Sequence, residues 1–139
     1  MDVGAHRITA SHVWHCTAPL QQVQSNGFSS MGTGLPGAIA AKLTHPSRPV
    51  VALTGDMGLW MTLGELGVVQ ERKMDLVVVY LADQALSLIA LKQERIGLPT
   101  HGVGFENPEV SSLAEAFGGT GHRVQGADAV ETAVRLACS

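Results

Sequence analysis

Two apolar runs divide the chain, one at residues 49–54 and the other at 76–81. The first consists mainly of small and β-branched residues, and the second is apolar throughout, which is typical of a strand buried on both faces. Elsewhere, apolar residues recur at every third or fourth position, the spacing of amphipathic helices. The pattern predicts further short strands at 20–25 and 122–124, and helices that begin near Ser30, Thr62, Leu86, Asn107 and Asp128.

Polar residues at three of these helix starts support the assignment. Ser30 could cap the helix that follows it. Thr62 and Glu65 have the spacing of a capping box, and Asn107 precedes a proline, the order expected for a cap and a first helical position. Strands and helices therefore alternate, which predicts an α/β fold, a three-layer sandwich with a mostly parallel central sheet.

Composition narrows the class of protein. The chain has 139 residues, the size of one domain, with 45% apolar and only 15% charged residues, so we expect a partner to cover part of its exterior. The net charge is −3 without a basic patch, which argues against nucleic acid. No apolar run approaches the roughly 18 residues of a membrane span, and no signal peptide is present. Cys16 and Cys138 lack metal-ligand spacing, which favours a reducing cytoplasm.

Two acidic residues lie at the ends of the two apolar runs. Asp56 follows the first run in a Gly-Asp-x-Gly loop, and Asp83 follows the second. The carboxyl ends of parallel strands are where open α/β sheets bind ligands. Mg²⁺ is usually held by one or two carboxylates together with phosphate oxygens and water. The pattern predicts that Asp56, Asp83 and a carbonyl near Ala85 hold magnesium and a diphosphate, with glycine N–H groups facing the phosphate.

Other interpretations of these features stay open at this point. Asp56 and Asp83 could be unrelated turn residues, since Gly-Asp after a strand is common. His6, His12 and His15 are close enough in sequence to suggest a metal cluster, but no carboxylate or cysteine completes a ligand set, so His12 and His15 are better explained as surface or packing residues. The loop at 97–104 has the length and composition of a flap near a site.

Several motifs together resemble a known family, the thiamine-diphosphate-dependent enzymes. Gly55-Asp56-x-Gly58, then Glu65-Leu66, the apolar strand and Asp83, 27 residues after Asp56, are similar to that family's cofactor signature. Four further segments look most like its acetolactate synthase branch, particularly the catabolic type: Asn26-Gly27-Phe28, Leu35-Pro36-Gly37-Ala38-Ile39-Ala40, Lys92-Gln93 and Gly104-Phe105-x-Asn107-Pro108. The resemblance covers nearly the whole chain.

The resemblance implies cofactor contacts for nine residues. The metal would be held by Asp56, Asp83 and the carbonyl of Ala85. The diphosphate would be lined by His6, Gly55, Met57 and Gly58. Met31 would prop the cofactor in its bent shape, and the carbonyl of Ser29 would accept a hydrogen bond from the aminopyrimidine. Two residues depart from the family pattern, Met57 in place of a glycine and Ala82 in place of the first member of an Asn/Asp pair.

The resemblance also implies a fold and an activity. Residues 1–139 would form a single diphosphate-binding domain of the thiamine-diphosphate-binding fold, a fragment or subunit of a larger enzyme. That enzyme, a transferase or lyase of branched-chain amino acid biosynthesis, would decarboxylate pyruvate and join the product to a second 2-oxo acid. The activating glutamate would lie on a pyrimidine-binding domain, so we expect no catalytic residue in this chain, no activity in isolation, and a homo-oligomeric assembly.

Two alternatives remain beside this one. The chain could be a natural, separate subunit of a thiamine-dependent 2-oxo-acid decarboxylase. It could also be a non-catalytic remnant of the α/β module, an interpretation that Met57 and Ala82 motivate.

Overall fold

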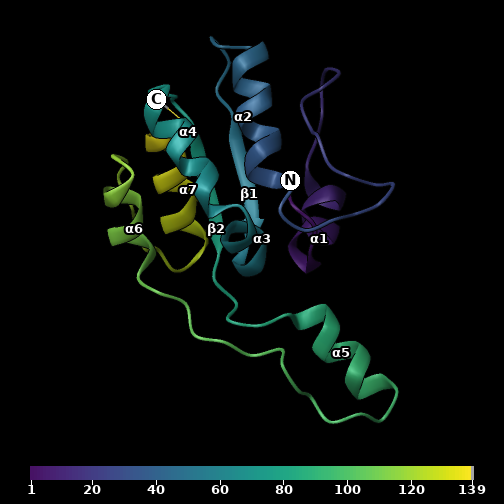
Figure 1. Ribbon diagram of the computed structural model, residues 1–139. Helices are drawn as coiled ribbons and strands as arrows, with labels where there is room; N and C mark the ends of the chain where they lie inside the picture. The colour runs from purple at the N-terminus through teal and green to yellow at the C-terminus, as the bar shows by residue number, and fades with distance from the viewer. Residues whose placement is uncertain (139) are drawn as a thin grey trace.

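Two parallel strands form the centre of the protein. The computed structural model describes residues 1–138 and contains the strands β1 (Val51–Gly55) and β2 (Val77–Leu81). Val51 pairs with Val77 and Gly55 with Leu81, so both strands end at the same edge of the sheet (Figure 1). The two long strands and their parallel orientation, predicted from the two apolar runs, are confirmed.

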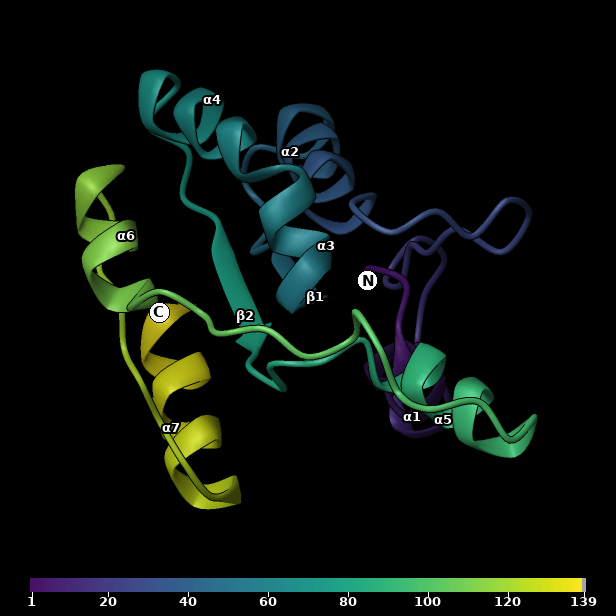
Figure 2. The same cartoon turned by 60° about the horizontal axis from the view of Figure 1, so that its bottom comes forward.

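Helices cover this sheet on both sides. The helices of residues 1–138 are α1 (Ala5–Val13), α2 (Gly34–Thr44), α3 (Asp56–Met61), the short 3-10 helix η1 (Leu63–Glu65), α4 (Leu66–Glu71), α5 (Ser87–Arg95), α6 (Val110–Ala116) and α7 (Ala127–Ala137). Turning the molecule shows α2 and α4 on one side of the strands and α7 on the other (Figure 2). The predicted α/β class, with a parallel sheet between helices, is confirmed.

The core lies between the sheet and the helices α2, α3 and α4. Its buried centre is formed by Leu35, Ile39 and Leu59. Partly buried side chains pack around them: Leu63, Leu66, Val68, Val69, Met74, Leu76, Val78 and Tyr80. A fully buried leucine contributes about 2 kcal/mol through removal of its apolar surface from water. This packing fixes α2 and α3 against β1, the strand that leads to Asp56.

A remote carboxylate, that of Asp2, caps the start of α2. Asp2 is completely buried, and its Oδ1 accepts hydrogen bonds from the backbone N–H groups of Thr33, at 3.0 Å, and Gly34, at 3.3 Å. Its Oδ2 accepts from the N–H of Gly32 at 3.1 Å. The first N–H groups of a helix have no partner within the helix, and a negative charge there is favourable. The predicted cap, Ser30, is wrong, because its hydroxyl donates to the carbonyl of Met31.

The same residue attaches the N-terminal segment to the sheet. The backbone N–H of Asp2 donates to the carbonyl of Leu53 at 2.8 Å, and Oδ2 accepts from the hydroxyl of Thr54 at 3.2 Å. Asp2 therefore joins the N-terminus, the start of α2 and the end of β1. The helix α1, which begins three residues after Asp2, was not predicted from the sequence.

The two short strands predicted at 20–25 and 122–124 are wrong. Both segments lack strand pairing in the structure. The apolar residues of the first, Leu20 and Val23, are exposed, so this segment has no face to bury in a sheet. Its polar groups bond to α1 instead, with Ser11 donating to the side chain of Gln24 and Arg7 to the carbonyl of Ser25.

Two predicted helix caps also differ from the structure. Thr62 does not cap a helix, since its hydroxyl donates to the carbonyl of Gly58, and the segment after α3 is a 3-10 turn that leads into α4. The helix expected from Asn107 begins at Val110, where the side chain of Glu109 accepts from the N–H of Ser111. Asn107 is thereby free of a capping role, and its side chain bonds elsewhere.

Residues 82–108 extend from the body as an arm that carries α5 (Figure 1). An isolated antiparallel bridge between Ala85 and Gly104 closes the base of the arm. At this bridge the N–H of Leu86 donates to the carbonyl of Val103 at 2.8 Å. We call residues 83–86 and 103–107 the neck of the arm. The loop predicted to act as a flap, 97–104, belongs to this arm.

Replacement of Asp2 should cost much of the stability of the fold. In Asp2→Ala, three buried backbone N–H groups and the Thr54 hydroxyl lose their acceptor, so we expect the free energy of unfolding to fall by about 3 kcal/mol. Urea denaturation measures the loss. Asp75→Ala is the matched control, because its carboxylate is 86% exposed and lies 3.8 Å from Lys42 in a surface ion pair, worth less than about 1 kcal/mol. Equal losses in the two variants would contradict the structural role of Asp2.

Candidate functional site

Asp56 lies where β1 passes into α3, and its carboxylate is surrounded by donors. The residue is 4% exposed. Oδ1 accepts from the hydroxyl of Tyr80 and from Nδ2 of Asn107, both at 2.5 Å. Oδ2 accepts from the backbone N–H groups of Asp83, at 2.9 Å, and Gln84, at 2.7 Å. A carboxylate offers about four acceptor positions, so these four donors occupy all of them.

Tyr80 is held in its protonated form. Its burial at the end of β2, together with the hydrogen bond to the Asp56 carboxylate, raises the pKa of the Tyr80 hydroxyl far above its usual range. The tyrosine therefore acts as a permanent donor to Asp56 at physiological pH. The indole of Trp60 packs against the Tyr80 ring in a T-shaped arrangement, with 6.3 Å between ring centroids.

Asp83 approaches Asp56 through its backbone and not through its side chain. The Asp83 carboxylate is exposed and accepts a hydrogen bond from the hydroxyl of Ser87. The turn after β2 is completed by Gln84, whose φ of 58° lies in the left-handed region. The carbonyl of Ala85 is not used by the bridge to Gly104, because the bridging bonds involve the flanking residues. The structure thus brings the backbone of the Asp83–Gln84 turn to the Asp56 carboxylate, while the Asp83 carboxylate points to Ser87 and Ala85 follows one residue later in the chain.

His6 packs against the end of β1. A Cβ added to Gly4 would lie 2.6 Å from the His6 ring, too close for the ring to stay in place, and one added to Gly55 would lie 3.2 Å from it, a tight contact. The Nε2 atom of His6 is buried and has no hydrogen-bond partner within residues 1–138. Burial lowers the pKa of His6. A buried ring nitrogen without a partner is uncommon and points to a group that the chain itself does not supply.

Gly58 is required by Asp2. A Cβ at this position would lie 1.6 Å from Oδ2 of Asp2 and 2.8 Å from the hydroxyl of Thr54. The second glycine of the Gly-Asp-x-Gly loop is therefore explained by the buried carboxylate beneath it.

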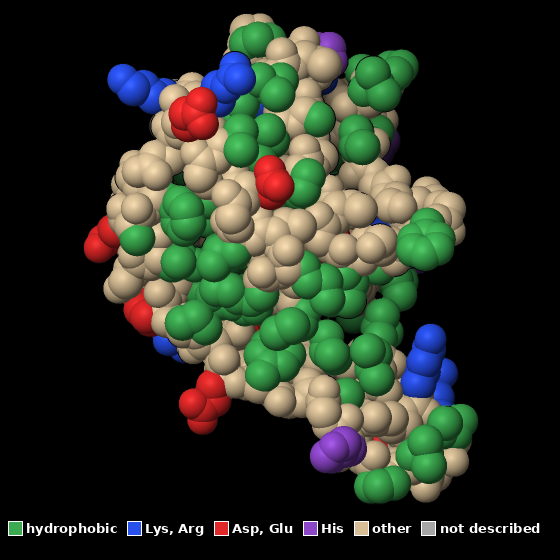
Figure 3. All heavy atoms as spheres, viewed as in Figure 1, with side chains coloured by type: hydrophobic (Ala, Val, Ile, Leu, Met, Phe, Trp, Pro, Cys, Tyr) green, Lys and Arg blue, Asp and Glu red, His purple; other side chains and the backbone are tan. Residues whose placement is uncertain are grey.

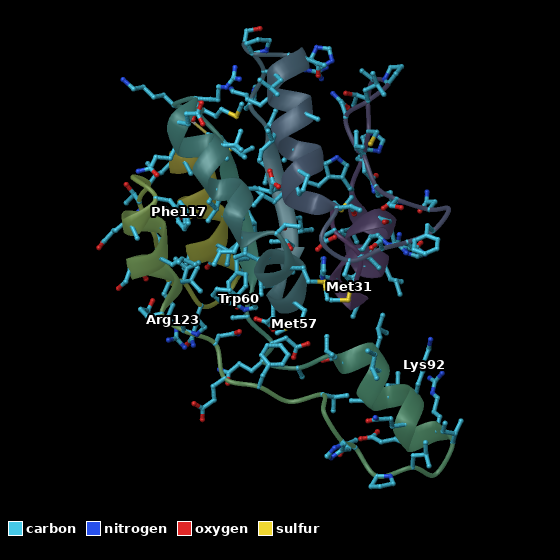
Figure 4. The ribbon with its side chains drawn as sticks, viewed as in Figure 1. Met31, Met57, Trp60, Lys92, Phe117 and Arg123 are labelled. Carbon is cyan, nitrogen blue, oxygen red and sulfur yellow. The ribbon has the colours of Figure 1, made fainter. Side chains whose placement is uncertain are left out.

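The remaining predicted site residues lie near the same edge of the molecule. Met31, Met57 and Trp60 follow the border of the body from which the arm extends (Figure 4). Met31 precedes α2 and Met57 lies in α3, and both are half-buried. Ser29 has a φ of 54°, in the left-handed region that costs a non-glycine residue free energy. Strained backbone of this kind is concentrated at functional sites.

Apolar side chains gather over this part of the surface (Figure 3). Met61 at the end of α3, Leu81 at the end of β2 and Leu88 in α5 are exposed apolar residues. Exposed apolar patches of this kind mark contacts with other protein surfaces or with ligands.

Comparison with known proteins identifies the family. The family model described as "Thiamine pyrophosphate enzyme, C-terminal TPP binding domain" matches residues 2–139. The chain belongs to this family. The resemblance predicted from the Gly-Asp-x-Gly loop and its neighbouring motifs is confirmed.

Acetolactate synthases are among the relatives of this TPP binding domain. The chain is 35% identical to the acetolactate synthase isozyme 2 large subunit of Escherichia coli (strain K12), over 96% of its own length and 25% of that protein. It is 33% identical to an acetolactate synthase of Bacillus subtilis (strain 168), over 96% of the chain and 24% of that protein. It is 30% identical to the catabolic acetolactate synthase of Raoultella terrigena, over 99% of the chain and 24% of that protein. The chain thus spans about a quarter of the length of these curated relatives.

The donor chemistry of the site fits the cofactor that the family name gives. The partnerless His6 Nε2, beside Gly55, could donate to or accept from a phosphate group. Asp56, Asp83 and the Ala85 carbonyl are oxygen donors of the type that Mg²⁺ prefers. Residues 1–138 contain no group of three or more His, Cys, Asp or Glu side chains that could hold a metal alone. Mg²⁺ sites commonly complete their ligand set with phosphate oxygens and water. A metal at Asp56 would displace one of its four donors.

Four residues that shape the site were missed in the sequence, namely Asp2, Trp60, Tyr80 and Asn107. Asn107 carries the clearest available signal, since it belongs to a segment that resembles the acetolactate synthase branch, but its position before a proline favoured a helix cap. Asp2 carries no local signal, because its partners are 30 to 52 residues away.

Along the described chain, none of the helices has the length and apolar character needed to cross a bilayer.

Gly58→Ala should destabilise the TPP binding domain through Asp2. The added methyl group overlaps Oδ2, and overpacking of this kind costs about 1–3 kcal/mol. In the double variant with Asp2→Ala the overlap is gone, so we expect the combined loss in unfolding free energy to be smaller than the sum of the two single losses. Gly67→Ala in α4 is the control, because no atom lies within 4 Å of its added Cβ, and it should be neutral or stabilising. An additive double variant would show that the two residues do not interact.

The lowered pKa of His6 should make stability depend on pH. The pKa of His6 is lowered in the folded chain, so the unfolded chain binds the proton first as the pH falls through its ordinary pKa of about 6.5. Stability falls where the unfolded state binds more protons at lower pH. We expect the wild type to lose stability relative to His6→Gln between about pH 7.5 and pH 5.5, as measured by thermal unfolding. Parallel curves for the two proteins would contradict this.

Proposed function

We propose that this chain binds the Mg²⁺-diphosphate end of thiamine diphosphate in an acetolactate-synthase-like enzyme. The observation that carries the proposal is the position of Asp56 at the carboxyl end of β1, in contact with the turn that presents Asp83 and Ala85, within a chain of the TPP binding family. This is the edge of an α/β sheet at which ligands bind.

Each residue has a role in this proposal. The Asp56 and Asp83 carboxylates and the Ala85 carbonyl hold the metal. His6 contacts the diphosphate through Nε2, while Gly55, Met57 and Gly58 line it with their backbone. Met31 supports the cofactor and the Ser29 carbonyl accepts from its aminopyrimidine. When bound, the cofactor supplies the electron sink for cleavage of the bond next to a 2-oxo group, and the protein supplies binding and orientation.

The rest of the enzyme would come from other domains. A pyrimidine-binding domain, on this or another chain, contributes the activating glutamate, so residues 1–139 form one domain without a catalytic residue of its own and without activity alone. The enzyme is a cytoplasmic homo-oligomer that decarboxylates pyruvate and transfers the product to a 2-oxo acid, in branched-chain amino acid biosynthesis. The exposed apolar side chains near the arm and the 15% of charged residues support contact with such a domain. A separate subunit of a 2-oxo-acid decarboxylase would have the same site and would also need a pyrimidine-binding domain from a partner.

One observation favours a second candidate, a module that no longer binds the cofactor. All four acceptor positions of Asp56 are satisfied by the chain itself, so this carboxylate needs no cation. Met57 and Ala82 also depart from the family pattern. In this candidate the Asp56 network only stabilises the fold.

Titration of Mg²⁺ and thiamine diphosphate into the chain, with and without an added pyrimidine-binding domain, tests the two candidates. The cofactor-binding domain should gain thermal stability only when Mg²⁺ and thiamine diphosphate are both present, by about 3 kcal/mol at a hundredfold excess over Kd. Asp83→Ala should abolish this gain while leaving the unliganded chain about as stable, because its side chain is exposed and bonds only to Ser87. Glu94→Ala, an exposed change on α5, is the control.

Two outcomes would contradict the proposed function. If no ligand-dependent gain appears even with the pyrimidine-binding domain present, the chain is the non-binding module. If the chain alone turns over pyruvate, the proposed division of the site between two domains is wrong.

A further inference from the structure

Asn107 bonds to the site from the far end of the arm. Its Nδ2 donates to Oδ1 of Asp56, although 51 residues separate the two in the chain. The backbone N–H groups of Asp83 and Gln84, at the near end of the arm, donate to the other oxygen of the same carboxylate. A single carboxylate therefore receives hydrogen bonds from both sides of the neck.

The orientation of the Asn107 amide is determined by chemistry. The indole N–H of Trp60 is only a donor, and it lies 3.0 Å from Oδ1 of Asn107. The NH₂ group of the amide must then face Asp56, whose ionised carboxylate is only an acceptor. Aspartate at position 107 would accept from Trp60 equally well but would place a second carboxylate against Asp56.

The two sides of the neck are also bonded to each other. The N–H of Leu86 donates to Val103, and the N–H of Phe105 donates to Gln84 at 3.1 Å. Val103 is buried, whereas α5 beyond it has no buried residue. The neck is therefore one hydrogen-bonded unit, and it is attached to the body by hydrogen bonds to Asp56 and from Trp60.

We propose that Asn107 is a positioning residue, which fixes the rotamer of Asp56 and fastens the neck of the arm to the end of β1. Trp60 acts with it by fixing the direction of the amide. Where Asp56 serves as a metal ligand, which rests on the proposed function, Asn107 also sets the direction in which that carboxylate presents itself. The fastening of the neck does not depend on any ligand.

Amide hydrogen exchange, followed by NMR on the full chain without cofactor, tests the fastening. In Asn107→Ala we expect the amides of Asp83, Gln84, Leu86 and Phe105 to exchange about tenfold faster, the effect of losing one hydrogen bond to a charged group. The amides of α2 and of the sheet should keep their rates. Asn107→Asp should accelerate the neck further because of charge repulsion, and Trp60→Phe should accelerate it less. Asn26→Ala, the matched control at an exposed asparagine, should change nothing.

Unchanged exchange at the neck in both Asn107 variants would overturn the proposal. Uniform acceleration over α2, the sheet and the neck would also overturn it, because that pattern indicates a general loss of stability. Should Asn107→Ala fail to fold, Trp60→Phe gives the same comparison with the amide still present.

A second measurement connects Asn107 to the metal. The Mg²⁺ concentration that gives half-maximal binding of thiamine diphosphate should rise about tenfold in Asn107→Ala and stay at the wild-type value in Asn26→Ala. An unchanged Mg²⁺ dependence in Asn107→Ala would overturn the role toward Asp56. If the wild type binds no cofactor even with a pyrimidine-binding domain present, the proposed function fails, while the exchange result still decides whether Asn107 fastens the neck.

Discussion

The structure depends on a buried negative charge, the carboxylate of Asp2, which is held by hydrogen-bond donors from α2 and β1. Taking a carboxylate out of water costs several kcal/mol, and Asp2 is completely buried. Three backbone N–H groups at the start of α2 and the hydroxyl of Thr54 offset that cost, helped by the positive end of the helix dipole. Because the donors belong to two different elements, the charge is stable only when α2, β1 and the N-terminal segment are assembled. The position of His6 against Gly55, and the need for glycine at position 58, both follow from this arrangement.

Asp56 resembles Asp2 in being saturated with donors, but its donors are of a different kind. Those of Asp2 come from a helix start and a strand, both packed in the core. Three of the four donors of Asp56 come from the neck of the arm, and only Tyr80 belongs to the sheet. Exchange of a donor for a ligand at Asp2 would disrupt the core, whereas at Asp56 it requires only local movement of the neck. Of the two buried carboxylates among residues 1–138, Asp56 is therefore the one whose surroundings agree with the ligand role proposed above.

Features that depend on neighbouring residues could be predicted from the sequence, whereas contacts between residues far apart in the chain could not. The strands β1 and β2 could be predicted because a continuous apolar run is a local signal, and Asp56 and Asp83 were placed at the sheet edge for the same reason. The strand expected at 20–25 is wrong because strand formation needs a neighbouring strand to pair with. The residues around Leu20 and Val23 do not reveal whether the fold supplies one. Asn107 has the local appearance of a cap, yet its partners are Asp56 and Trp60, far away in the chain. Contacts between residues so far apart in the chain produce no periodic pattern in the sequence. The roles of Asp2 and Asn107 could therefore be assigned only from the three-dimensional structure.

The hydrogen bonds of the Asp2 carboxylate join residues that are 30 to 52 positions apart. Closing loops of this length costs conformational entropy before any bond is gained, and contacts of this type slow folding. The chain should collapse first around Leu35, Ile39 and Leu59, whose elements follow one another closely in sequence, and capture its N-terminal segment afterwards. The side of the domain that carries His6 would then be completed last during folding, and it would be the first to detach in partial unfolding.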